Sequence, residues 1–125
     1  MVIDDKYAKM WKDDGIVFFV YKPVRCIDLT IAKEVVLQRL KLQNGIDYPV
    51  LCDLRAVQGA DKAARDYLAN QGSLLTKAQA FLVESNYTLN ILTMYLRTAA
   101  VNTTIQIFED ENQALVFLNQ FRRKT

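Results

Sequence analysis

The stretch "YPVLCDLRAVQGADKAARDYLA", Tyr48–Ala69, decides the fold of this chain. It opens with the apolar run "YPVLCDL", which is typical of a strand that is buried on both faces. A short loop follows, and then apolar residues recur at the spacing of a helix with one buried side. These are Ala60, Ala64, Tyr67 and Leu68. A buried strand that leads into an amphipathic helix is the repeating unit of a parallel sheet.

The same alternation continues on both sides of this stretch. Further strands are expected at Ile16–Tyr21 ("IVFFVY"), Ala78–Val83 ("AQAFLV") and, at an edge, Thr103–Phe108 ("TTIQIF"). Further helices are expected between the N-cap Asp28 and Asn44-Gly45, over Ser85–Ala100, and after Asp110. An Asp-Gly turn joins Ile16–Tyr21 to an earlier strand, "DDKYAKMWK", whose lysines suit a sheet edge.

This pattern predicts one α/β domain over residues 1–125, with the order ββαβαβαβα. We expect a mostly parallel five-stranded sheet with right-handed crossovers and helices on both faces. The first strand is expected to be its antiparallel N-terminal edge.

Composition limits the possible functions. Sixteen basic and fourteen acidic residues leave a net charge of +2, too small a bias to indicate nucleic acid as a partner. No apolar run reaches the roughly 20 residues of a membrane span. Two cysteines and a charged N-terminus without a secretory leader predict a cytoplasmic protein.

Several kinds of chemistry are missing from the sequence. There is no histidine, which removes the commonest general base and the commonest transition-metal ligand. The two cysteines form no zinc signature, and the scattered glycines form no phosphate-binding loop. We therefore expect no enzyme activity, no metal and no cofactor.

Binding at the carboxyl ends of the strands remains open, because ligands of parallel sheets tend to lie there. The residues expected at this edge are Arg25, Arg55, Gln58, Glu84 and Asn86. Arg55 either holds an anionic ligand or pairs with a nearby acid.

The stretch Tyr48–Ala69 resembles the STAS domain, the SpoIIAA-like fold of anti-sigma-factor antagonists, and the resemblance extends over roughly Val17–Phe121. "AQAFLVES" and "IQIFEDENQALVFL" are similar to uncharacterised bacterial domains of the STAS/SEC14 type. The resemblance implies a non-catalytic switch or adaptor. Phospho-regulated members carry an Asp-Ser pair at the start of the second helix, and a partner kinase phosphorylates the serine. Here this pair corresponds to Asp61 and Lys62, so the phosphorylatable hydroxyl is absent.

The expected helix over Ser85–Ala100 is apolar on two sides. One side suffices to pack on the sheet, and Tyr87, Ile91 and Met94 lie on roughly the opposite side. Either a neighbouring helix covers these three residues or they form a contact surface, for which a homodimer is one arrangement.

Two functions follow from these observations. The first is a non-enzymatic bacterial regulatory or protein-interaction domain that binds a protein partner or itself as a homodimer. The second is a carrier of a small apolar or anionic ligand at the carboxyl ends of the strands.

Overall fold

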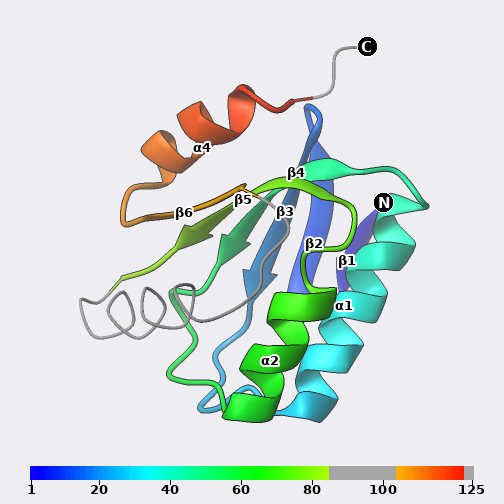
Figure 1. Cartoon of the computed structure of the whole chain (residues 1–125), viewed down its shortest axis with the longest axis vertical. Coiled ribbons are helices and arrows are strands. Elements are labelled where there is room, and N and C mark those ends of the chain that lie inside the picture. The colour runs from blue at the N-terminus through cyan, green and yellow to red at the C-terminus, as the bar shows by residue number, and fades with distance from the viewer. Residues whose placement is uncertain (85–103, 123–125) are drawn as a thin grey trace.

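The computed structural model of the chain describes residues 1–84 and 104–122. Its six strands form one sheet in which the spatial order follows the order of the chain (Figure 1). The strands are β1 Val2–Asp4, β2 Ala8–Asp13, β3 Ile16–Tyr21, β4 Tyr48–Asp53, β5 Thr76–Leu82 and β6 Thr104–Phe108. The described helices are α1 Leu29–Gln43, α2 Lys62–Gln71 and α4 Glu111–Asn119. The expected helix over Ser85–Ala100 lies outside the described residues.

The N-terminal edge differs from the prediction of five strands. The expected first strand, "DDKYAKMWK", divides into the end of β1, a turn and β2, and β1 pairs antiparallel with β2. Asp5 makes the turn, because its Oδ1 accepts hydrogen bonds from the backbone N–H groups of Tyr7 (2.9 Å) and Ala8 (3.0 Å). The sheet edge is therefore β1, and β2 lies inside, paired with both β1 and β3. A strand of three residues is too short to show an alternation in sequence.

The parallel part of the sheet agrees with the prediction. Strands β3, β4, β5 and β6 pair in parallel, and β6 is an edge strand, as expected. Helices α1 and α2 lie side by side on one face, and α4 lies on the other (Figure 1). Successive right-handed crossovers that step in one direction across a sheet place their helices on the same face, which accounts for α1 and α2. Helix α4 follows the last strand and is free to cover the opposite face.

Each face of the sheet has its own core, because side chains alternate along a strand. In β4, Cys52 faces α1 and α2, whereas Leu51 faces α4. The larger core gathers residues of β2, β3, β4, α1 and α2, and Met10 and Val35 in it are fully buried. The smaller core joins β5 to α4, where Leu118 is fully buried.

A buried polar network ties the end of α1 to the loop before β5. The Arg39 side chain, 3% exposed, donates to the backbone oxygens of Gly72 (3.1 Å) and Leu74 (2.9 Å) and to the side-chain oxygen of Gln43. Gln43 in turn donates to the oxygens of Ile46 (2.9 Å) and Leu75 (2.8 Å). Burial lowers the pKa of Arg39 to about 10, so the side chain stays charged at neutral pH. The network gives donors to loop carbonyls, of which that of Leu75 also accepts from the N–H of Tyr48.

None of the helices formed by residues 1–84 and 104–122 has both the length and the apolar character needed to cross a membrane.

Candidate functional site at the carboxyl ends of the strands

Two loops lie side by side beyond the carboxyl ends of β3 and β4. Val24 forms a parallel bridge with Val57, and Ile27 forms another with Ala60. Between these bridges, the N–H of Gln58 donates to the oxygen of Val24 at 2.9 Å. We call the segments Val24–Ile27 and Val57–Ala60 the loop ribbon. Its backbone pairing holds both loops in one conformation before any partner arrives.

The loop ribbon leads directly into α1 and α2. Asp28 caps α1 by accepting from the N–H of Ile31 (2.9 Å), and Asp61 caps α2 by accepting from the N–H of Ala64 (2.9 Å). The N–H of Asp61 donates to the oxygen of Ile27 at 3.0 Å, so the bonding between the loops continues to the first residue of the second cap. Both helix starts therefore have fixed positions relative to each other.

Lys62 occupies the first turn of α2 and points to solvent. Its side chain is 81% exposed, and its Nζ lies 2.7 Å from Oδ2 of Asp66 one turn later, as the i, i+4 spacing predicts. The position that corresponds to the phosphorylated serine of STAS domains thus carries a solvated cation.

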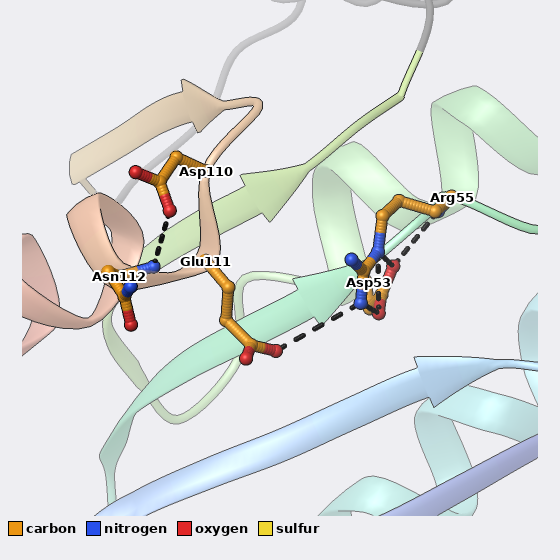
Figure 2. Close-up of polar contacts among 5 residues, drawn as sticks. All are labelled: Asp53, Arg55, Asp110, Glu111 and Asn112. Atoms are coloured by element: carbon orange, nitrogen blue, oxygen red, sulfur yellow. Dashed lines mark hydrogen bonds and ion pairs between the residues drawn. The ribbon is translucent and has the colours of Figure 1, made fainter.

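Arg55 is paired with an acid instead of being free for an anion. The Nη2 and Nε atoms of Arg55 donate to Oδ2 (2.7 Å) and Oδ1 (3.0 Å) of Asp53, the last residue of β4. Figure 2 shows this pair beside the first turn of α4, where Glu111 lies 4.0 Å from Arg55. The hydrogen bond to Asp53 raises the pKa of Arg55, and Glu111 and Glu84 add smaller effects in the same direction. Asp53, Glu84 and Glu111 together outweigh the single positive charge of Arg55.

The structure brings four of the predicted edge residues to the carboxyl ends of the strands. Arg25 and Gln58 lie on the loop ribbon and are exposed, whereas Arg55 and Glu84 follow β4 and β5. The fifth residue, Asn86, and the predicted contact residues Tyr87, Ile91 and Met94 lie outside the described residues.

Sequence reasoning missed Asp53 and Glu111 as part of this edge. The spacing Asp-x-Arg at the end of a buried strand is the signal that could have identified Asp53. Glu111 comes from the far end of the chain, and only the sheet order places it near Arg55.

The two cysteines have different surroundings. Cys52 is 8% exposed in the core between the sheet, α1 and α2, and burial raises its pKa to about 12. Cys26 lies on the loop ribbon and is exposed. Neither cysteine forms a disulfide, and residues 1–84 and 104–122 contain no cluster of acids and cysteines able to hold a metal ion.

A shallow cavity of about 440 Å³ lies at the other end of the strands, near the amino ends of β4 and β5. Its lining residues are Gly45, Ile46, Asp47, Leu75 and Thr76. Leu75 has a φ of 58°, which is uncommon for a residue with a side chain, and the bond from Gln43 to its oxygen holds it there. The cavity is far from the strand ends where the sequence placed a ligand.

Comparison with known structures supports the fold. The chain is similar to an uncharacterised protein of the DUF3478 family from Shewanella loihica PV-4, whose crystal structure has a SpoIIAA-like fold. The two share 14% sequence identity with a TM-score of 0.63, over 93% of this chain and 98% of the other. At this identity the likeness shows the fold alone, and it confirms the predicted STAS-like, SpoIIAA-like architecture.

No curated protein matches the sequence. A family model described as a domain of unknown function, DUF7793, matches residues 10–122. This match begins within β2 and covers the strands β3 to β6 and every described helix. The chain therefore belongs to the DUF7793 family.

Proposed function

We propose that this chain is a non-enzymatic regulatory domain that binds a protein partner through the loop ribbon and the first turn of α2. The paired loops carry the proposal. Exposed loops with irregular backbone lose entropy when a partner orders them, whereas a surface that is already ordered avoids that cost. The bridges Val24–Val57 and Ile27–Ala60 give the ribbon this order in the free chain.

The exposed side chains of this surface suit a polar contact. Arg25, Cys26, Gln58 and Lys62 are all exposed. They offer hydrogen-bonding groups and positive charge beside the exposed acids Asp28 and Asp61 of the two helix caps. A surface with both signs of charge fits a partner whose polar groups match it in charge and position, since complementary charges steer association and set its register.

Partner binding here does not depend on a phosphoserine. Phosphorylation of a helix start acts by adding about two negative charges. At this helix start the side chain of Lys62 carries a fixed positive charge and is bound to Asp66. We infer that the domain is an adaptor whose affinity for its partner is constant rather than switched at position 62.

The alternative of a small-ligand carrier has less support at the strand ends. Ligand crevices in parallel sheets form where consecutive crossovers pass to opposite faces. Helices α1 and α2 lie on one face, so β3, β4 and β5 create no such point. The one charge proposed for an anion, Arg55, is engaged by Asp53.

We also infer a bacterial cytoplasmic setting. One structural relative with this fold is a protein of Shewanella loihica. Both cysteines are unpaired, as is usual in a reducing compartment.

The experiment blocks the loop ribbon by chemical modification of its exposed cysteine, Cys26. A bulky maleimide is attached to Cys26 of the folded full-length chain, and partner capture from lysate of the source organism is quantified by mass spectrometry against the unlabelled chain. The proposal predicts that a specific partner is lost at least tenfold on labelling. The charge reversals Arg25→Glu and Lys62→Glu should reduce the same partner.

The matched control is Lys41→Glu, an exposed lysine in the last turn of α1 at the other end of the helix. This variant changes the net charge equally and should retain the partner. If the labelled chain, Arg25→Glu and Lys62→Glu all capture the partner as well as the control does, the loop ribbon is not the binding surface.

A further inference from the structure

The second edge of the sheet, β6, differs sharply from the first. In the described part of the chain, β6 pairs with β5 alone. Its sequence, "TIQIF", has no charge and no proline. The edge strand β1 has three residues and ends in Asp4, and the charged residues Asp5 and Lys6 follow. Charged and short edge strands discourage pairing with other chains, so β1 is protected in a way that β6 is not.

The backbone groups that β6 presents outward can be assigned. The oxygen of Phe108 accepts from the N–H of Val83 at 2.9 Å, which directs the polar groups of Phe108 toward β5. Polar groups of successive residues in a strand point to alternate edges, so Gln106 also faces β5. Ile105 and Ile107 therefore direct their N–H and C=O groups away from the sheet.

We propose that β6 pairs antiparallel with β6 of a second copy of this chain, about a twofold axis at Gln106, to form one continuous sheet. In this register Ile105 of each copy lies opposite Ile107 of the other. These two residues carry the outward groups, and a directly opposed pair of this kind exchanges both of its N–H···O bonds. The proposal concerns a surface distinct from the loop ribbon and stands independently of the partner proposed above.

The side chains are self-complementary in this register, as an isologous contact requires. Phe108 faces α4, and its ring centroid lies 5.6 Å from that of Phe117. Gln106 and Thr104 share that face, whereas Ile105 and Ile107 lie on the other. The twofold axis thus places isoleucine beside isoleucine on one face and amide beside amide on the other, both of which are favourable cross-strand pairs.

Charge favours the antiparallel arrangement over a parallel one. Glu109, Asp110 and Glu111 follow β6 directly. Antiparallel pairing about Gln106 places the two acidic segments at opposite ends, about 25 Å apart at 3.3 Å per residue. That separation exceeds the Debye length of about 8 Å at physiological salt, so the segments do not repel each other appreciably. Parallel pairing would set the same carboxylates side by side.

The test is sedimentation of the full-length chain over a range of concentrations. We expect a monomer–dimer equilibrium for the wild type. Gln106→Lys places like charges opposite each other on the twofold axis and should raise the dissociation constant about fivefold. Thr104→Lys adds the same charge to the same face but opposite Phe108 of the second copy, and should change the constant less than twofold.

Two further variants make the geometry specific. An equimolar mixture of Gln106→Lys and Gln106→Glu should restore dimerisation to at least the wild-type level, because the opposed charges then attract. Ile107→Pro removes an outward N–H without removing a bond to β5, so it should keep the circular dichroism of the wild type and lose the dimer.

A wild type that is monomeric at every concentration would overturn the proposal and leave a strand of a different protein as the occupant of this edge. A wild-type dimer that Gln106→Lys and Ile107→Pro leave intact would place the dimer contact elsewhere on the chain. Arg25→Glu, which tests the loop ribbon, should leave the dimerisation constant unchanged, so the two proposals fail separately.

Discussion

The carboxylate of Asp53 binds the side chain of Arg55 at the end of β4, with 2.7 Å between Oδ2 and Nη2 and 3.0 Å between Oδ1 and the backbone nitrogen of Arg55. The Asp53 side chain is 8% exposed and that of Arg55 is 45% exposed. One acid therefore fixes both the backbone and the side chain at the point where the chain leaves the sheet.

Asp53→Asn should lower the free energy of unfolding by about 1–2 kcal/mol. The amide keeps one acceptor, but its NH2 group faces the guanidinium, so the charge-assisted bonds are lost. The half-exposed position of Arg55 keeps the effect below that of a fully buried pair. Urea denaturation measures the change. Asp66→Asn, which breaks the exposed pair with Lys62, is the control and should cost less than about 0.5 kcal/mol.

Arg39→Leu should destabilise the fold by about 3 kcal/mol, because it removes the donor to the half-buried oxygens of Gly72 and Leu74 and leaves the buried side-chain oxygen of Gln43 without this partner. The loop over these residues should also lose protection in hydrogen exchange. Lys33→Leu, at an exposed position of the same helix, is the matched control. Equal stabilities of the two variants would show that water replaces the guanidinium without loss.

Stability should fall in alkaline solution because of Cys52. Burial raises its folded-state pKa from 9.0 to about 12, so between these values the unfolded chain loses the thiol proton while the folded chain keeps it. The stabilisation from the buried, protonated thiol is fully present below pH 9. By pH 10 the free energy of unfolding should have fallen by about 1.4 kcal/mol from this group. Between pH 8 and pH 10 the free energy of unfolding of Cys52→Ala should fall less than that of the wild type. Identical pH dependence in the two proteins would contradict this account. Burial also raises the pKa of Tyr21, but Tyr21 is present in both proteins and so does not affect the comparison.

The exposure of the cysteines predicts their reactivity. A thiol reagent should modify Cys26 rapidly in the native protein and Cys52 only after unfolding, because Cys52 is buried among core side chains. Peptide mapping after native and denatured labelling distinguishes the two. Rapid native labelling of Cys52 would reopen a redox role.

A kinase of the anti-sigma type should leave the start of α2 unmodified, because Lys62 has no hydroxyl. Phosphopeptide mapping after incubation tests this, with a SpoIIAA-like substrate of the same kinase as a positive control. Phosphate on Ser73 or Thr76 would show that a switch lies at the other end of α2.

Local patterns predicted much of this fold because its main strands and helices begin and end at residues that are recognisable in the sequence. The apolar run of β4, the caps Asp28 and Asp110, and the stop at Asn44 are all where the sequence placed them, whereas the cap at Asp61 was not predicted. Strand β1 was missed because three residues show no period. The role of Arg39 was also missed, since a charged residue on a helix normally faces water, and only the loop that folds over it gives its donors partners.

The candidate site was predictable only in part. The edge that carries Arg25, Arg55, Gln58 and Glu84 follows from the rule that parallel strands end together. The pairing of the two loops does not, because it depends on backbone bonds between segments about 30 residues apart in sequence, and these leave no side-chain pattern.

The order of the strands also bears on how the chain assembles. Each strand after β1 pairs with the strand that precedes it in the sequence. A nascent chain that emerges from the ribosome can therefore add each strand to an edge already in place, without waiting for a distant segment to be synthesised. Parallel sheets whose strand order is shuffled must hold apolar edges open until late strands arrive, and they fold slowly for that reason. In this protein the last described strand, β6, completes the sheet, so the growing edge of the nascent chain and the unprotected edge of the finished domain are the same kind of surface.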